Sequence, residues 1–210
     1  MIQFLIERFV PNWQNTQNST VREKYGILAA SVGILSNIFL FIIKILTGLI
    51  FNSIAITADA VNNLSDAGSS VITLLAFKIA GKPADPEHPY GHARMEYISG
   101  MAVSFIIILL GLQLIGSSFE KILHPETVTV SYLTYAVLII SILTKLWQGI
   151  FNRTVGKRID SDALQATAAD SLNDIFATSA VLISAVVYHF TSIPIDGWMG
   201  MAGAIFITIS

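Results

Sequence analysis

The stretch KYGILAASVGILSNIFLFIIKILTGLIF, residues 24–51, decides the class of this protein. Between its two ends it carries a single charge, Lys44. A run of about 20 apolar residues is enough to cross the hydrocarbon core of a bilayer as a helix. The whole chain agrees, because only 12% of its 210 residues are charged, where soluble domains carry about 25%. The sequence therefore predicts an integral membrane protein.

Further apolar runs follow and predict an all-α fold, a bundle of six transmembrane helices. The expected spans of a transmembrane domain over residues 25–210 are about 25–51, 53–80, 95–119, 132–152, 163–190 and 196–210. Residues 1–24 are expected to be a cytoplasmic N-terminal segment. Its apolar residues suit either a short amphipathic helix on the membrane surface or a flexible tail; they are Phe4, Leu5, Phe9, Val10 and Trp13.

The last apolar run is short for a membrane span. Its fourteen residues from Gly197 to Ser210 cover only about 21 Å as a helix, and a bilayer core is about 30 Å thick. We therefore expect this span to be truncated and a C-terminal cytoplasmic domain to be absent from the sequence.

The cations between the spans are distributed unevenly and predict an orientation. Nine lie in the N-terminal segment and in alternate joints, and the other loops contain only Lys121. Positive loops face the cytoplasm. We therefore expect the N-terminus, the loop 81–94, the joint 152–162 and the end of the chain to be cytoplasmic. The nine are Arg8, Arg22, Lys24, Lys78, Lys82, Arg94, Arg153, Lys157 and Arg158.

Two of the expected spans carry acidic and amide residues at one helical spacing. Asn62 and Asp66 lie in the second span, and Asp170 and Asp174 lie in the fifth. Residues four apart share one face of a helix. The two spans run in opposite directions, and each pair lies roughly 12–20 Å from its end of the span. Both pairs should therefore meet near the middle of the membrane.

Such a cluster is costly unless it is compensated. Each carboxylate near the membrane centre costs about 2.5–3.5 kcal/mol on insertion scales. A divalent cation, or protons when the cation is absent, would offset the charge. Two lysines within spans, Lys44 and Lys145, are expected either to extend toward the membrane surface or to pair with acids between helices. Asp59 is equally consistent with two roles. It could cap its helix or contact lipid headgroups, or it could support the cluster from a neighbouring position.

At these residues the sequence resembles the cation diffusion facilitator family of metal/proton antiporters, from about Val21 to Ser210. The resemblance is carried by ADAVNNLSD (58–66), KPADPEHPYGHARMEYISG (82–100) and ATAADSLND (166–174). It implies a transport site at Asn62, Asp66, Asp170 and Asp174, outward transport of metal, a homodimer and regulation by a C-terminal domain. Neither pair contains the histidine of zinc transporters, and the ligand set is similar to that of members that export manganese.

The chemistry of the ligands agrees with this departure. Carboxylate and amide oxygens suit Mn²⁺, whereas imidazole suits Zn²⁺. Mn²⁺ is therefore the favoured transported ion, with Fe²⁺, Zn²⁺ and Cd²⁺ as alternatives. Because metal and protons compete for the same carboxylates, we expect metal efflux in exchange for protons. The cell membrane is the expected location.

The loop DPEHPYGH, residues 85–92, offers a possible second metal site. The resemblance implies Asp85, His88 and His92 as its ligands. Pro89 argues for a turn here and not a helix. The alternative is that these residues cap the third span and contact the cytoplasmic surface.

Other classes of protein are less well supported. A cation channel lined by the same acids and a non-transporting subunit or metal sensor stay open as alternatives. The soluble segments are too short for a catalytic domain, no prosthetic group is indicated, and no nucleophile lies beside a base, so we expect no enzyme. The sequence contains no cysteine and no basic patch, which excludes disulfides and gives no sign of nucleic-acid binding.

Overall fold

The computed structural model describes residues 2–50, 54–86, 88–124 and 132–191, together with residues 198, 201, 202 and 205. Within these ranges the chain forms helices and no strands. They are α1 (Ile2–Phe9), α2 (Ser19–Ile50), α3 (Ile54–Ala80), α4 (Arg94–Leu123), α5 (Tyr132–Ile159) and α6 (Asp162–Thr191). The all-α prediction is confirmed. The sixth predicted span, 196–210, lies almost wholly outside the described residues.

Three of the long helices have the length and composition of membrane spans. They are α2, α5 and α6, with 32, 28 and 30 residues. At 1.5 Å per residue, each is longer than the 30 Å or so of a bilayer core. The protein is thus a multi-pass membrane protein. The count of six spans and the cytoplasmic placement of both termini stay predictions.

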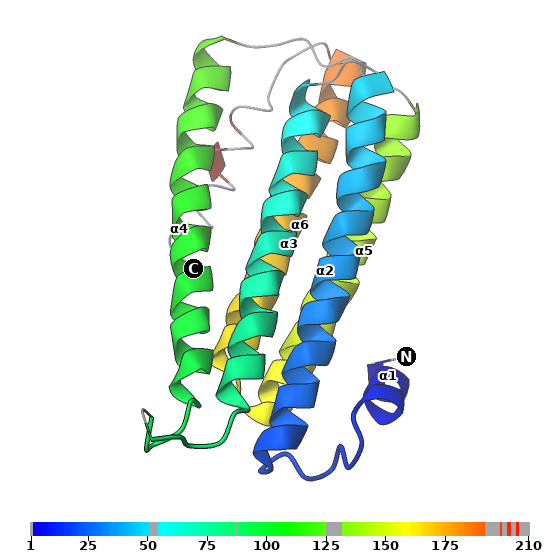
Figure 1. Cartoon of the computed structure of the whole chain (residues 1–210). Coiled ribbons are helices and arrows are strands. Elements are labelled where there is room, and N and C mark those ends of the chain that lie inside the picture. Colours follow the sequence, from blue (N-terminus) through cyan, green and yellow to red (C-terminus); the bar gives the residue numbers. More distant parts are fainter. Residues whose placement is uncertain are drawn as a thin grey trace.

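The helices stand side by side as an antiparallel bundle (Figure 1). Helix α2 packs along α3, α5 packs along α6, and α2 also contacts α5. Helix α4 contacts α3 and α6 and stands to one side in Figure 1. We call the lower end in Figure 1, where α2, α4 and α6 begin, the N-terminal end of the bundle.

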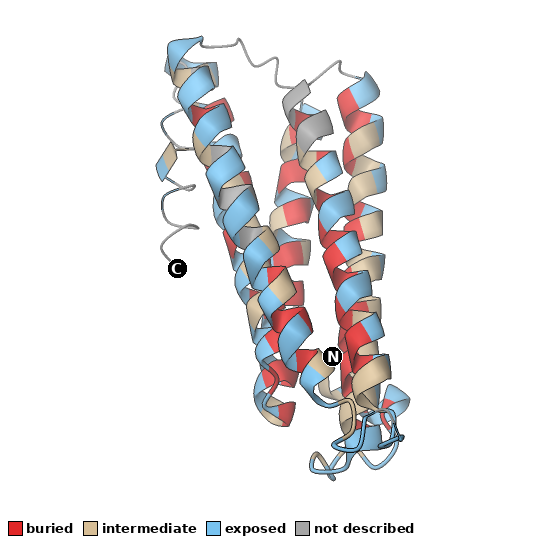
Figure 2. Cartoon of the chain, turned by 60° about the vertical axis from the view of Figure 1, so that its left-hand side comes forward, coloured by how far each residue is buried: buried red, intermediate tan, exposed pale blue. Residues whose placement is uncertain are grey.

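The bundle buries many polar side chains beside its apolar ones and exposes large apolar side chains on its outer face. Buried polar side chains include Asn37, Gln148 and Asn152, each 1% exposed. Large apolar side chains such as Leu35 and Leu49, by contrast, are about 70% exposed on α2. Figure 2 shows buried and exposed residues on different sides of the helices. An apolar outer face is compatible with lipid, whose hydrocarbon cannot hydrogen-bond polar groups.

Small residues allow α2 and α3 to approach closely. A side chain on Gly33 would meet the hydroxyl of Ser70 at 2.6 Å, and a side chain on Gly26 would overlap the ring of Phe77. Gly26 and Gly33 are seven residues apart and so lie on one face of α2. This close contact sets the position of α3, which carries Asn62 and Asp66.

An apolar cluster fills the N-terminal end of the bundle. It combines residues from α1 and from the ends of α2, α3, α5 and α6; its members are Ile6, Val10, Val21, Tyr25, Ala29, Phe77, Phe151, Val155, Ile159 and Leu164. Helix α5 therefore continues to Ile159, seven residues beyond the predicted end of its span at 152. Most of the polar joint predicted over 152–162 is therefore helical, and Val155 and Ile159 pack into this cluster.

The N-terminal segment forms a helix that packs on the bundle. Ile6 and Val10 are fully buried in the apolar cluster, whereas Phe4 and Phe9 remain exposed. The hydroxyl of Tyr25 donates a hydrogen bond of 2.9 Å to the backbone carbonyl of Trp13. The helix is confirmed in place of the flexible tail, since one face of α1 is covered by the bundle, and its placement on the membrane surface stays a prediction.

Helices α5 and α6 are joined by a short turn that fixes the start of α6. Asp160 adopts a left-handed conformation with φ of 52°, and the backbone N–H of Ser161 donates to the carbonyl of Gly156 at 2.9 Å. The hydroxyl of Ser161 accepts a hydrogen bond from the N–H of Leu164 at 3.4 Å. Such a left-handed helix end followed by a serine cap is a common way to reverse the chain. It sets the register of Asp170 and Asp174.

Candidate functional site

The two polar pairs predicted from the sequence meet inside the bundle. Carboxylate oxygens of Asp66, Asp170 and Asp174 lie within 4.8 Å of one another. Asn62 donates a hydrogen bond from Nδ2 to Oδ1 of Asp174 at 3.2 Å, which joins α3 to α6. The structure therefore brings all four predicted residues into one place, which we call the acidic cluster.

The acidic cluster lies deep in the structure. Asp66 is halfway along α3, and Asp174 is close to the middle of α6. The side chains of Asp66 and Asp174 are only 3% and 13% exposed. Asn63 adds a hydrogen bond of 3.4 Å from Nδ2 to Oδ2 of Asp66. Four oxygen-bearing side chains that converge in this way could bind one hard divalent cation.

A lysine from a third helix enters the acidic cluster. Lys145 lies at the middle of α5, and its Nζ is 2.7 Å from Oδ2 of Asp66 and 2.5 Å from Oδ2 of Asp174. Its side chain is 2% exposed. With every group ionised, three carboxylates and one ammonium leave two formal negative charges in the metal-free cluster.

A second buried lysine is paired away from this cluster. Lys44 of α2, 1% exposed, lies 2.8 Å from Oδ2 of Asp59 on α3. Of the two predicted places for Lys44 and Lys145, pairing with acids between helices is the one found. Asp59 therefore neutralises a buried lysine and lies within α3, past its N-terminus, and its supporting place beside the acidic cluster stays a prediction. The sequence indicated that the lysines could pair but not with which acids.

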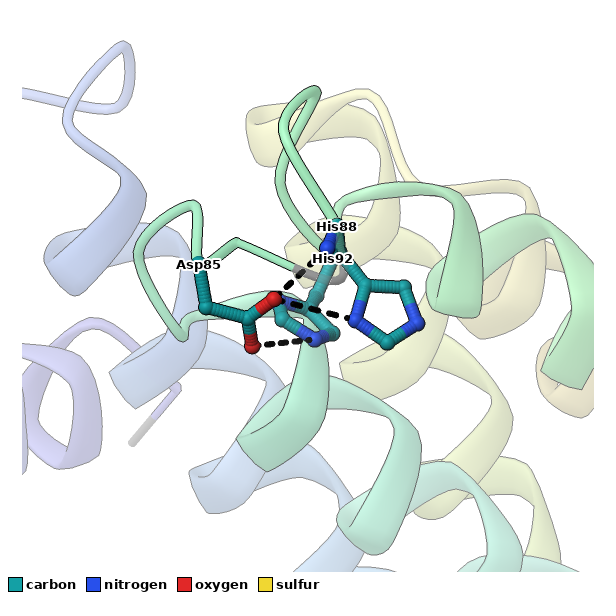
Figure 3. A group of neighbouring side chains, drawn as sticks. All are labelled: Asp85, His88 and His92. Carbon is teal, nitrogen blue, oxygen red and sulfur yellow. Dashed lines mark hydrogen bonds and ion pairs between the residues drawn. The ribbon is translucent and has the colours of Figure 1, made fainter.

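The loop residues Asp85, His88 and His92 also lie together, near the N-terminal end of α4 (Figure 3). Oδ1 of Asp85 is 3.1 Å from Nδ1 of His88, and Oδ2 is 3.6 Å from Nε2 of His92. One ligand atom from each residue lies within 4.8 Å of the others. That they bind a metal stays a prediction. Glu87, in the same motif, lies outside the described residues.

The turn that Pro89 predicted in this loop is confirmed. The N–H of His88 donates to the carbonyl of Asp85 at 3.1 Å, and the N–H of Gly91 donates to the carbonyl of His88 at 2.9 Å. The alternative, in which these side chains cap the third span, is wrong. The N-cap of α4 is Ala93, and no side chain donates or accepts a capping hydrogen bond there.

Removing the carboxylate of Asp85 is expected to loosen this turn. Oδ1 of Asp85 accepts the backbone N–H of His88 at 2.6 Å, and this hydrogen bond lowers the pKa of the exposed Asp85 carboxyl. The stabilisation of the turn by this hydrogen bond should therefore be complete above about pH 5. It should decrease as the pH falls through the lowered pKa of Asp85. In Asp85→Ala, which removes the acceptor, hydrogen exchange over residues 83–92 should be faster at pH 7 and should lose this pH dependence. Equal exchange in both proteins would contradict this account of the turn.

The fold and the acidic cluster define a multi-pass membrane protein with a polar interior that could receive a cation. The sequence matches the cation efflux transmembrane domain over residues 30–210. It is 35% identical to the manganese efflux system protein MneS of Bacillus subtilis, over 80% of this chain and 58% of MneS. This chain belongs to the cation efflux family, the cation diffusion facilitators.

Two other relatives show the breadth of the similarity. The manganese efflux system protein MneP of Bacillus subtilis is 28% identical over 79% of this chain and 56% of its own length. The magnetosome protein MamM of Magnetospirillum gryphiswaldense is 28% identical over 85% of this chain and 55% of its own. The chain thus spans somewhat more than half the length of these curated relatives.

Proposed function

We propose that this protein exports divalent metal cations, above all Mn²⁺, from the cytoplasm in exchange for protons. Asn62, Asp66, Asp170 and Asp174 bind the transported ion. The observation that carries the proposal is the convergence of three carboxylates within 4.8 Å, contributed by antiparallel helices and buried at mid-height in the bundle. Charges at such a depth are expensive and are typical of ion pathways.

The ligand chemistry and the relatives support manganese together. All four side chains offer oxygen, and hard oxygen ligands suit Mn²⁺ better than Zn²⁺. Two relatives are named for manganese efflux. Fe²⁺, Zn²⁺ and Cd²⁺ are the alternative substrates of the same site.

Proton exchange follows from the use of carboxylates. A carboxylate must be ionised to serve as an anionic ligand, so protons and metal compete for the same oxygens. Alternate opening of the acidic cluster to the two sides would carry metal one way and protons the other. For the acidic cluster to open toward the N-terminal end of the bundle, the residues of the apolar cluster around Phe77 and Phe151 would have to separate, because they are buried against one another.

Flux into proteoliposomes tests this proposal. We expect Mn²⁺ transport that accelerates when an opposing pH gradient is imposed, and slower transport of Zn²⁺ and Cd²⁺. Flux that ignores the pH gradient would favour a channel. Binding of Mn²⁺ without any flux would favour a metal sensor or a non-transporting subunit.

Changing one ligand type should change the selectivity. We expect Asn62→His to shift the preference from Mn²⁺ toward Zn²⁺ by about tenfold or more, because imidazole replaces an amide oxygen and suits zinc. The measurement is the ratio of Mn²⁺ to Zn²⁺ flux in vesicles. Asn15→His, a change of the same kind at an exposed position in the loop before α2, should leave the ratio as it is. An unchanged ratio in Asn62→His would contradict Asn62 as a ligand.

The assembly and location of the protein are proposed on the family resemblance. The transmembrane domain over 25–210 is expected to form a homodimer in the cell membrane, with residues 1–24 on the cytoplasmic side. Light scattering of the detergent-solubilised protein should give the mass of two chains. The function is transport and not enzymatic catalysis.

A further inference from the structure

Lys145 occupies the place where a bound cation would lie. Its ammonium contacts the Oδ2 atoms of Asp66 and Asp174 at 2.7 and 2.5 Å. A metal ion that drew in all three carboxylates would need oxygens of these same groups. An ammonium and a divalent cation that contact the same carboxylates at such distances repel each other strongly, because both are positive and little solvent separates them.

We propose that the Lys145 ammonium is a tethered counter-ion, which neutralises part of the acidic cluster when no metal is bound and leaves it when the transported ion binds. This inference rests on the proposed function. Lys145 is then a positioning residue that competes with the substrate and is not a ligand. A buried carboxylate without a partner is costly, so the ammonium offsets part of the negative charge of the acidic cluster between one metal ion and the next, and protons offset the rest.

The displaced ammonium has acceptors close to its docked position. Oε1 of Gln148, one turn along α5 from Lys145, and Oδ1 of Asn37 on α2 are buried and have no hydrogen-bond partner among the described residues. A side chain on Gly33, one turn before Asn37, would lie 3.6 Å from Nε2 of Gln148, so α2 and α5 meet at this level. Buried carbonyl oxygens without donors can each accept a hydrogen bond from an ammonium.

The competition lowers the affinity for the metal without removing any ligand. Each metal ion that binds must displace the ammonium from Asp66 and Asp174, and the returning ammonium helps to expel the ion. The chain offers a comparison, because Lys44 is as deeply buried as Lys145 and is also paired with a carboxylate, that of Asp59, which is not part of the acidic cluster. Loss of Lys44 removes the same charge from the bundle interior without affecting this competition.

Titration of the purified protein in lipid nanodiscs with Mn²⁺ at pH 8 tests the inference. Lys145→Met and Lys145→Leu should bind Mn²⁺ at least about tenfold more tightly than the wild type, because the competitor is gone. Lys44→Met should bind as the wild type does. Equal or weaker binding by both Lys145 variants would overturn the inference, since a merely structural lysine gives no gain in affinity when it is removed.

A double-variant comparison tests the second position of the ammonium. Gln148→Leu removes an acceptor and should weaken Mn²⁺ binding when Lys145 is present. In the Lys145→Met background the same change should have no effect. Weakening of equal size in both backgrounds would show that Gln148 acts only through packing, which would overturn the proposed second position.

Two further outcomes separate this inference from the proposed function. If the wild type binds no Mn²⁺, and Asp170→Ala behaves identically, the proposed function itself fails. If the wild type binds Mn²⁺ and the Lys145 variants do not fold, a structure of the Mn²⁺-bound wild type decides. Nζ of Lys145 should then have moved out of hydrogen-bond distance of Asp66 and Asp174. An ammonium still bonded to both would overturn the inference alone.

Discussion

Asp170→Ala is expected to abolish the exchange of Mn²⁺ for protons while leaving the fold intact. Within the described part of the chain, Lys145 bonds to Asp66 and Asp174 but not to Asp170. The variant therefore removes a proposed ligand and keeps the ion pairs that join α5 to α3 and α6. Mutation of a residue that hydrogen-bonds to a metal ligand lowers metal affinity by about 10–100-fold. Loss of the ligand itself should lower the affinity by at least as much.

The measurement is Mn²⁺ flux into proteoliposomes under a pH gradient, with thermal stability measured in parallel. Asp160→Asn is the matched control, because it removes an exposed carboxylate at the joint between α5 and α6. Asn also tolerates the left-handed conformation found at that position. Wild-type flux in Asp170→Ala would show that Asp170 is no ligand.

Gly26→Ala is expected to give the largest loss of stability from a single methyl group. A Cβ at this position would overlap ring carbons of Phe77, which is itself 1% exposed and packed in the apolar cluster. The ring has no free space to enter, so α2 and α3 must separate. Overpacking of this kind costs about 1–3 kcal/mol. The melting temperature of the solubilised protein should fall.

Gly116→Ala provides the control for this prediction. A Cβ at Gly116 on α4 would meet no heavy atom of the described residues within 4 Å. Alanine is also the better helix former by about 1 kcal/mol, so stability should be unchanged or slightly higher. A melting temperature in Gly26→Ala equal to that of the wild type would contradict the close packing of α2 on α3.

The long helices could be predicted from the sequence because membrane spans need continuous apolar runs. Spans expected at 132–152 and 163–190 correspond to α5 and α6. The helices differ from the predicted spans at their ends, where they continue beyond the apolar runs. Helix α2 begins at Ser19, six residues before the predicted span, because Asn18 accepts hydrogen bonds from the N–H groups of Thr20 and Val21.

The composition of the acidic cluster was predictable and its charge balance was not. Spacing of four residues puts each polar pair on one face of its helix. The matched depth of the pairs on two antiparallel helices brings Asp66 and Asp174 to one level. Whether the side chain of Lys145 points into the acidic cluster depends on the rotation of α5 about its own axis. Contacts of α5 with α2 and α6 set that rotation. The pairing of Lys44 with Asp59 was hidden for the same reason. A lysine within an apolar run indicates a buried partner but not which acid it meets.

The most direct test of the account is a structure determined with Mn²⁺ bound. We predict one ion held by oxygen atoms of Asn62, Asp66, Asp170 and Asp174, midway along α3 and α6. An ion held elsewhere, with these four side chains left as they are in the metal-free protein, would contradict the central claim.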